Sequence, residues 1–219
     1  MAATHESRNF FLDGPAGRLE AILWRPANSK RPPLAALVSH PHPLFGGTMH
    51  NKVVYRAAKS LDEFGLPVLR FNFRGAGTSA GAFDHGRGEQ GDVRAALDFL
   101  ANEFPGAPVL LAGFSFGSWV GLGVGCEDVR VAELIGIGVP VNESDFAYLS
   151  GCSKPKLFVQ GSKDKFGSLE RLEMLVVSLP GENRLTAVKD ADHFFTGKLD
   201  QLGRAITNWL KERHPQAHE

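Results

Sequence analysis

The chain has 219 residues, and its 24 basic and 24 acidic side chains give a formal net charge of zero at pH 7. Nucleic acids and anionic membranes attract a basic excess, so this balance argues against both as partners. No stretch approaches the roughly 18 apolar residues of a membrane span, and the first residues form no apolar leader. We therefore expect a cytoplasmic protein, a monomer or small homo-oligomer, that acts on a small molecule.

Two apolar runs, 8–12 and 18–24, flank a Gly- and Pro-containing turn and predict an antiparallel pair of strands. Later runs are apolar without alternation, which is typical of parallel strands buried on both faces. They cover residues 34–39, 67–72, 108–113, 132–139, 156–160 and 184–189. Amphipathic stretches predict helices over 48–64, 88–103, 115–125, 168–178 and 198–212.

This alternation predicts an α/β fold with a mostly parallel central sheet and helices on both faces. The length matches one α/β domain and leaves little chain for a second. We expect a single domain over 1–219, with a core of about 8–212 and a polar tail at 213–219.

The most informative motif is Gly113-Phe114-Ser115-Phe116-Gly117, which follows the apolar run 108–112 and opens an apolar stretch at helical spacing. A sharp strand-to-helix turn exposes a serine hydroxyl at the top of a sheet, which is the setting that a catalytic serine needs. Only minimal side chains fit the two positions where strand and helix close on each other, and glycine occupies both. The motif predicts that Ser115 is a nucleophile, and the alternative is a structural glycine-rich turn.

A serine hydroxyl is a weak nucleophile at neutral pH and needs a base, which in turn needs an orienting carboxylate. Asp164 and His193 each follow a predicted strand, at the carboxyl ends where α/β sheets build their sites. The order along the chain is Ser, Asp, His. With this motif and order the chain resembles the α/β-hydrolase superfamily, which implies a triad of Ser115, His193 and Asp164.

Two further loops carry this resemblance. Residues 72–79 look like the superfamily's Arg-Gly-x-Gly-x-Ser loop, although Asn72 replaces an acidic residue often found there. His40-Pro41-His42-Pro43 resembles the His-Gly-x-Pro loop that donates to the oxyanion. In detail the chain is similar to small lidless bacterial serine hydrolases of the dienelactone-hydrolase-like type, with Ser115 where dienelactone hydrolases carry a cysteine. That departure implies ordinary ester chemistry, and no cofactor is implied.

The tetrahedral intermediate of such a reaction needs backbone N–H donors for its oxyanion. The first expected donor is Phe116, directly after the nucleophile and at the start of its helix. Pro41 and Pro43 have no N–H, so the second expected donor is His42, with Leu44 as the weaker alternative. In this interpretation the imidazole of His42 is incidental.

Several residues have a second interpretation. Asp164 could cap the following turn or pair with a neighbouring lysine, and Asp192 is its competitor as the acid. Arg74 is expected to bind a carbonyl or carboxylate of the protein, with a substrate carboxylate as the alternative. The two cysteines are expected to be reduced thiols. Three histidines close in sequence raise the possibility of a metal site, but we expect none because prolines restrict their loop: His40, His42 and His50.

Aromatic residues crowd the same predicted end of the sheet, and Phe114 and Trp119 are expected in the core. Phe116 is expected to form a pocket wall, and Phe83 and Phe146 to close the rim. The other residues expected to line the substrate pocket are Leu44, Phe45, Phe166 and Phe194.

Lipases often insert a lid where residues 140–155 lie in this chain, but this segment has room for only one helical turn near 145–149. The sequence therefore predicts a lidless serine hydrolase that cleaves short-chain carboxylic esters. A thioesterase, acyltransferase or small peptidase on the same triad remains an alternative, as does a noncatalytic ligand-binding protein on this scaffold.

Overall fold

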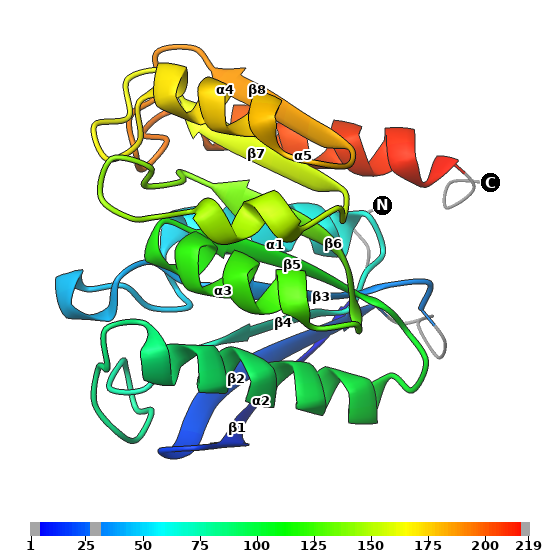
Figure 1. The fold of residues 1–219 in the computed structure, drawn as a ribbon. Coiled ribbons are helices and arrows are strands. Elements are labelled where there is room, and N and C mark those ends of the chain that lie inside the picture. The colour runs from blue at the N-terminus through cyan, green and yellow to red at the C-terminus, as the bar shows by residue number, and fades with distance from the viewer. Residues whose placement is uncertain (1–4, 27–31, 216–219) are drawn as a thin grey trace.

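Eight strands form one sheet in the part of the chain that this computed structural model describes, residues 5–26 and 32–215 (Figure 1). Their order across the sheet is β1-β2-β4-β3-β5-β6-β7-β8. β2 pairs antiparallel with β1 and β4, and the other pairs are parallel. The predicted mostly parallel sheet with a leading antiparallel pair is therefore confirmed. The strands are β1 (His5–Gly14), β2 (Gly17–Pro26), β3 (Ala35–Ser39), β4 (Val68–Phe71), β5 (Val109–Phe114), β6 (Val131–Ile137), β7 (Lys156–Gly161) and β8 (Asn183–Val188).

Helices cover both faces of this sheet, as predicted. In Figure 1, α2, α3 and α4 lie in front of the sheet, and α1 and α5 lie behind it. Most of the predicted polar tail, residues 216–219, lies outside the described residues. The helices are α1 (Lys52–Glu63), α2 (Arg87–Glu103), α3 (Phe116–Glu127), α4 (Leu169–Ser178) and α5 (Leu199–Arg213), with short 3-10 turns η1 (Pro43–Phe45) and η2 (Ala147–Gly151).

The sheet has a separate apolar core on each face, because successive side chains of a strand point to opposite sides. Leu111 of β5 packs in one core with Val93 of α2 and Val120 of α3. Its neighbour Leu110 packs in the other core, with Val53 of α1. Both faces are covered, which explains why the central strands are apolar without alternation.

Helix α1 begins at Lys52, four residues later than the sequence predicted. The side chain of Asn51 accepts a hydrogen bond from the N–H of Val53 at 2.9 Å and caps the helix. The preceding residues instead form the turn η1 and a loop beside the carboxyl end of β3. This later start leaves residues 40–51 free to form one side of the site.

Asn72, the departure from the superfamily pattern, follows β4 and is buried. Its amide nitrogen donates to the carboxylate of Glu20 on β2 at 2.7 Å, and its amide oxygen accepts from the N–H of Met49 at 2.7 Å. Glu20 also accepts from the N–H of Thr78 at 3.0 Å. The missing acidic side chain is thus supplied from a different strand, and the 72–79 loop stays anchored.

Between β6 and β7 the described chain forms only η2, so the predicted short helical turn is present, shifted by two residues. No cap domain covers the carboxyl ends of the strands within residues 5–26 and 32–215. Cys126 and Cys152 are free thiols, as predicted. Among the described residues, none of the helices combines the length and apolar character needed to cross a membrane.

Candidate active site

Ser115 lies at the turn between β5 and α3 with φ 54° and ψ −120°, a conformation that costs energy for a residue with a side chain. A Cβ atom on Gly113 would collide with the backbone of Gly117, and one on Gly117 would collide with the carbonyl of His40. Glycine is therefore required at both flanking positions, as the sequence predicted. The strained turn holds the serine side chain at the carboxyl end of the sheet.

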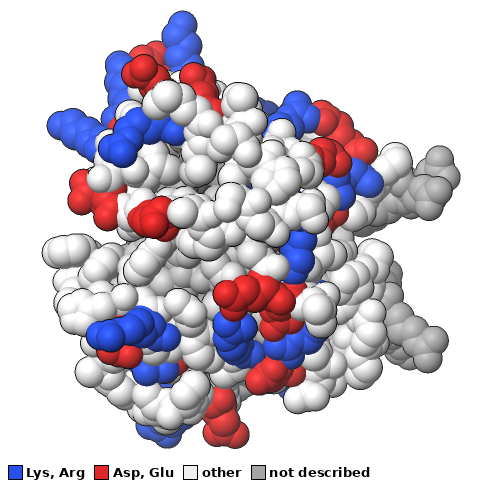
Figure 2. Space-filling view, in the orientation of Figure 1, with Lys and Arg blue, Asp and Glu red and all other residues white. Residues whose placement is uncertain are grey.

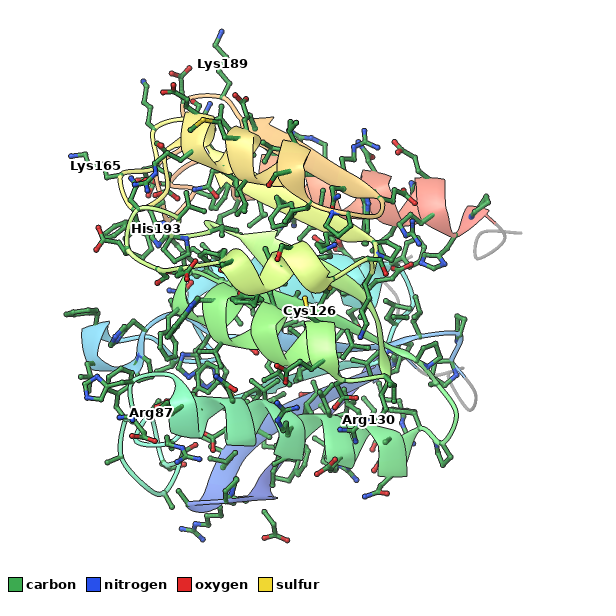
Figure 3. All side chains as sticks on the ribbon, viewed as in Figure 1. Arg87, Cys126, Arg130, Lys165, Lys189 and His193 are labelled. Carbon is green, nitrogen blue, oxygen red and sulfur yellow. The ribbon has the colours of Figure 1, made fainter. Side chains whose placement is uncertain are left out.

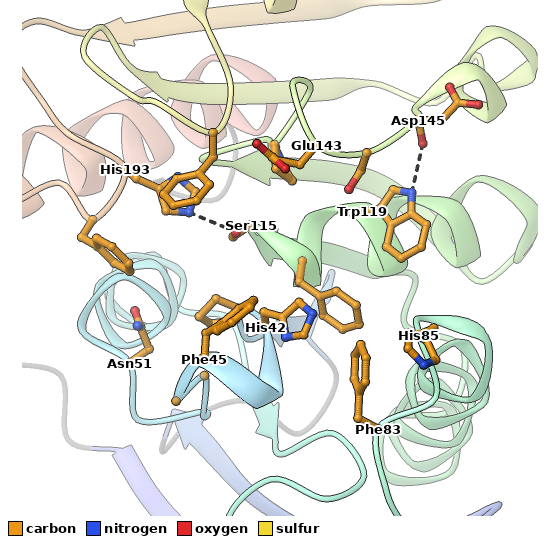
Figure 4. Close-up of a pocket in the computed structure, with 18 residues that line it drawn as sticks. His42, Phe45, Asn51, Phe83, His85, Ser115, Trp119, Glu143, Asp145 and His193 are labelled. Atoms are coloured by element: carbon orange, nitrogen blue, oxygen red, sulfur yellow. Dashed lines mark hydrogen bonds between the residues drawn. The ribbon is translucent and has the colours of Figure 1, made fainter.

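The structure brings the three predicted catalytic residues together from three separate loops. The Nε2 atom of His193 lies 3.0 Å from Oγ of Ser115, as Figure 4 marks, and its Nδ1 atom lies 2.8 Å from Oδ2 of Asp164. The side chains of His193 and Asp164 are only 7% and 0% exposed. A continuous hydrogen-bonded chain thus leads from a buried carboxylate to a partly exposed hydroxyl.

The carboxylate of Asp164 is held by groups other than the imidazole. One oxygen accepts from the backbone N–H groups of Phe166 at 2.9 Å and Gly167 at 3.3 Å. The other oxygen accepts from the side-chain amide of Gln160 at 3.0 Å. The sequence analysis missed Gln160, although it is the one polar side chain in the apolar run of β7, and a buried polar residue needs a partner.

The alternatives for Asp164 find other partners. Asp192 accepts from the N–H of Thr196 at 2.9 Å, and this backbone hydrogen bond lowers the pKa of its carboxyl group. Lys163 pairs with Asp190 at 2.8 Å rather than with Asp164. The geometry therefore favours Asp164 as the partner of His193.

His40 is fully buried, and both of its ring nitrogens are occupied. Its Nε2 atom accepts from the N–H of Phe73 at 2.9 Å, and its Nδ1 atom lies 2.6 Å from the carbonyl of Pro41, to which it donates. Burial lowers the pKa of His40 to about 4, so the ring is neutral at pH 7. No group of three or more His, Cys, Asp or Glu side chains in the described ranges could hold a metal ion.

The loop after His40 presents backbone donors toward the serine. Among the described residues, neither the N–H of His42 nor that of Phe116 has a hydrogen-bond partner. The N–H of Leu44 instead donates to Nδ1 of His42 at 3.3 Å, so geometry favours His42 over Leu44 as the second donor.

The imidazole of His42 is not incidental, because it packs among three aromatic rings. Its centroid lies 4.7 Å from those of Phe45 and Phe83 and 4.9 Å from that of Phe116. Partial burial lowers the pKa of His42. The ring therefore holds the loop in position as a neutral group.

A cavity of about 740 Å³ opens above Ser115 (Figure 4). Phe45, Phe166 and Phe194 line it, as predicted, but Leu44 does not, because its side chain on η1 is turned outward and 66% exposed. Phe146 is buried in the core rather than at the rim. The lining residues are Pro41, His42, Phe45, Gly46, Gly47, Asn51, Phe83, His85, Ser115, Phe116, Trp119, Pro140, Glu143, Ser144, Asp145, Phe166, His193 and Phe194.

Two other predicted residues have settled positions. Trp119 lines the cavity rather than lying in the core, and its indole N–H donates to the carbonyl of Asp145 at 3.0 Å. Arg74 forms a two-pronged ion pair with Asp92, with Nη2 to Oδ1 at 2.7 Å. Its guanidinium therefore has a structural partner, as expected, and Phe114 is buried in the core as predicted.

Known proteins share this sequence and architecture. A family model described as an alpha/beta hydrolase domain matches residues 45–214. An uncharacterized protein of Rickettsia prowazekii is 39% identical over 209 residues, which cover 91% of this chain and 87% of that protein. A Xanthomonas campestris structure, described as an α/β serine hydrolase without lid, has a TM-score of 0.87 at 37% identity and covers 94% of both chains.

A structure from Coxiella burnetii, described as an α/β serine hydrolase homologue, also has a TM-score of 0.87, at 38% identity over 93% of this chain and 97% of that one. These matches extend over nearly the whole chain and include the segment between β6 and β7 where a lid is inserted in other hydrolases. The chain therefore belongs to the α/β-hydrolase superfamily and is a hydrolase.

Proposed function

We propose that this hydrolase cleaves short-chain carboxylic esters through an acyl-enzyme on Ser115. The observation that carries the proposal is the hydrogen-bonded chain from Asp164 through His193 to Ser115. A neutral imidazole between a carboxylate and a hydroxyl is the arrangement that activates serine as a nucleophile at neutral pH.

In the acylation step, Nε2 of His193 takes the hydroxyl proton while Oγ of Ser115 attacks the ester carbonyl carbon. Asp164 holds the imidazole with its Nδ1–H toward the carboxylate and stabilises the imidazolium that forms. The carbonyl oxygen becomes an oxyanion, and the free N–H groups of Phe116 and His42 donate to it. His193 then gives the proton to the departing alkoxide oxygen, the C–O bond breaks, and an alcohol leaves.

In the deacylation step, His193 takes a proton from water, whose oxygen attacks the acyl carbon. The second tetrahedral intermediate collapses to a carboxylic acid, and the proton returns to Oγ of Ser115. Every proton is carried by His193, and the net reaction consumes one ester and one water. The open cavity above Ser115 admits both the substrate and this water.

A fluorophosphonate probe and a panel of p-nitrophenyl esters test this proposal. We expect the probe to label Ser115 and the enzyme to cleave the esters faster than an aminoacyl-nitroanilide or an acyl-CoA. Ser115→Ala and His193→Ala should each lower ester turnover by several orders of magnitude while the protein stays folded. The double variant should be little slower than either single variant, because the residues act as a unit.

Two results would contradict the proposal. An unlabelled Ser115 in folded protein would favour a noncatalytic binding protein. Losses that multiply in the double variant would mean that Ser115 and His193 do not act together.

A further inference from the structure

We propose that the pocket selects esters that carry a positively charged nitrogen, such as a quaternary ammonium group. This inference rests on the proposed esterase function and adds the charge of the preferred substrate. It follows from the charges that line the cavity and from the aromatic rings that face them.

The charged side chains of the lining are acidic. Glu143 and Asp145 line the cavity, and none of its lining residues is Lys or Arg. The Asp145 carboxylate accepts from the N–H of Ala147 at 2.8 Å and is turned outward in Figure 4. The Glu143 carboxylate has no hydrogen-bond or ion-pair partner among the described residues. It is therefore the one described carboxylate of the lining that is free to meet a cation.

The opposite wall of the cavity is aromatic. Figure 4 draws Glu143 across the cavity from His42 and Phe83. The centroids of Phe83 and Phe116 lie 5.7 Å apart, and those of Phe116 and Trp119 lie 5.9 Å apart, so the rings form a continuous wall. Aromatic faces attract a cation through their quadrupole and attract an anion much less.

Two further rings stand at the His193 end of the cavity. Phe166 and Phe194 lie 4.6 Å and 5.2 Å from the His193 ring, centroid to centroid. Their side chains are 45% and 43% exposed, so part of each ring is open to a ligand. A cation between Glu143 and these walls would meet both a carboxylate and π faces.

The nearby basic residues do not cancel this charge. Lys165 points outward, away from His193, in Figure 3, and Lys163 is paired with Asp190. Arg171 lines a neighbouring groove and lies 3.5 Å from the side-chain oxygen of Asn142. On the left side of Figure 2, acidic atoms lie directly above a band of uncharged residues, and basic atoms lie further out. The cavity therefore favours cations over anions.

The test compares the butyrate ester of choline with its uncharged analogue, in which carbon replaces the quaternary nitrogen. The two have nearly the same shape, so their ratio of kcat/KM isolates the charge. We expect the choline ester to be favoured by about tenfold, the combined effect of a cation over aromatic rings and a nearby carboxylate. Glu143→Gln should reduce this ratio to about threefold, and the matched variant Glu173→Gln, on the exposed face of α4, should leave it unchanged.

Equal kcat/KM for the two esters, or the same ratio in Glu143→Gln as in the unaltered enzyme, would overturn the inference while leaving the esterase proposal intact. If neither ester is cleaved, the esterase proposal fails. The inference is then tested by calorimetry of choline and its carbon analogue binding to Ser115→Ala. Preference for choline that disappears in the Ser115→Ala/Glu143→Gln protein supports the charge selection, and equal binding overturns it.

Discussion

The side-chain amide nitrogen of Gln160 lies 3.0 Å from Oδ2 of Asp164, the same oxygen that lies 2.8 Å from Nδ1 of His193. The amide also accepts from the N–H of Val139 at 2.8 Å and donates to the carbonyl of Gly167 at 2.8 Å. One buried side chain thus ties the end of β6 to the loop that carries the proposed catalytic acid.

We predict that Gln160→Met, which keeps the volume and removes the polar atoms, lowers both stability and turnover. The buried N–H of Val139 loses its partner, which costs about 2 kcal/mol of unfolding free energy. Asp164 also loses a donor that fixes its rotamer, so kcat should fall by about tenfold, a cost of about 1.4 kcal/mol in the barrier. Urea unfolding and steady-state kinetics measure the two effects separately. An unchanged kcat would mean that Gln160 supports the fold and not the acid.

The sequence predicted the sheet well because the central strands are short, apolar on both faces and separated by clear helical patterns. Ser115, Asp164 and His193 were predictable for a related reason. Each stands directly after a strand, and the carboxyl ends of parallel strands meet at one edge of the sheet.

Other parts of the site depend on contacts that no local pattern carries. Gln160 reaches Val139, 21 residues earlier, and Asn72 reaches Glu20 on another strand. Leu44 and Phe45 are neighbours on one short turn, yet Phe45 lines the cavity and Leu44 does not. Side-chain direction on a 3-10 turn follows from its orientation to the sheet, and composition does not encode that.

Comparison of two carboxylates tests the proposed acid. Asp164 accepts hydrogen bonds from two backbone N–H groups, Gln160 and His193, so the amide of Asp164→Asn would turn a donor toward a donor. We expect turnover to fall by about 10³- to 10⁴-fold, as for a triad whose imidazole is held in the wrong tautomer. Asp192→Asn should change turnover little, because the residue is exposed and only caps a turn. A crippled Asp192→Asn beside a near-normal Asp164→Asn would reverse the assignment.

The oxyanion proposal predicts opposite results for two changes at His42. This residue has φ −54°, which proline can adopt, so His42→Pro removes the N–H without forcing a new backbone angle. We expect it to cost about 2.7 to 4 kcal/mol of transition-state stabilisation. His42→Ala keeps the N–H but loses the ring that packs against Phe83 and accepts from Leu44, so kcat/KM should fall by less than about tenfold.

The pair is measured by kcat/KM on one ester, with circular dichroism to verify folding. A folded His42→Pro enzyme with near-normal turnover would eliminate this backbone donor. A severe loss in His42→Ala alone would instead assign a chemical role to the imidazole.

The last prediction concerns the acyl chain. The cavity above Ser115 is open to solvent, and the segment from β6 to β7 contributes η2 and no covering domain within the described residues. Each methylene that becomes buried contributes about 0.8 kcal/mol, roughly a fourfold gain in kcat/KM, but a methylene that stays in water contributes nothing. The walls at the serine are phenylalanine rings whose outer parts are exposed, so only the first carbons of an acyl chain find apolar contacts on several sides. We therefore expect kcat/KM on p-nitrophenyl esters to peak at roughly two to six acyl carbons, as in other small open ester pockets. A series from acetate to palmitate, measured below the solubility limit of each ester, gives the profile. A maximum at about twelve carbons or more, or a rate increase when the substrate forms a lipid interface, would instead indicate a long acyl tunnel that opens in the presence of substrate.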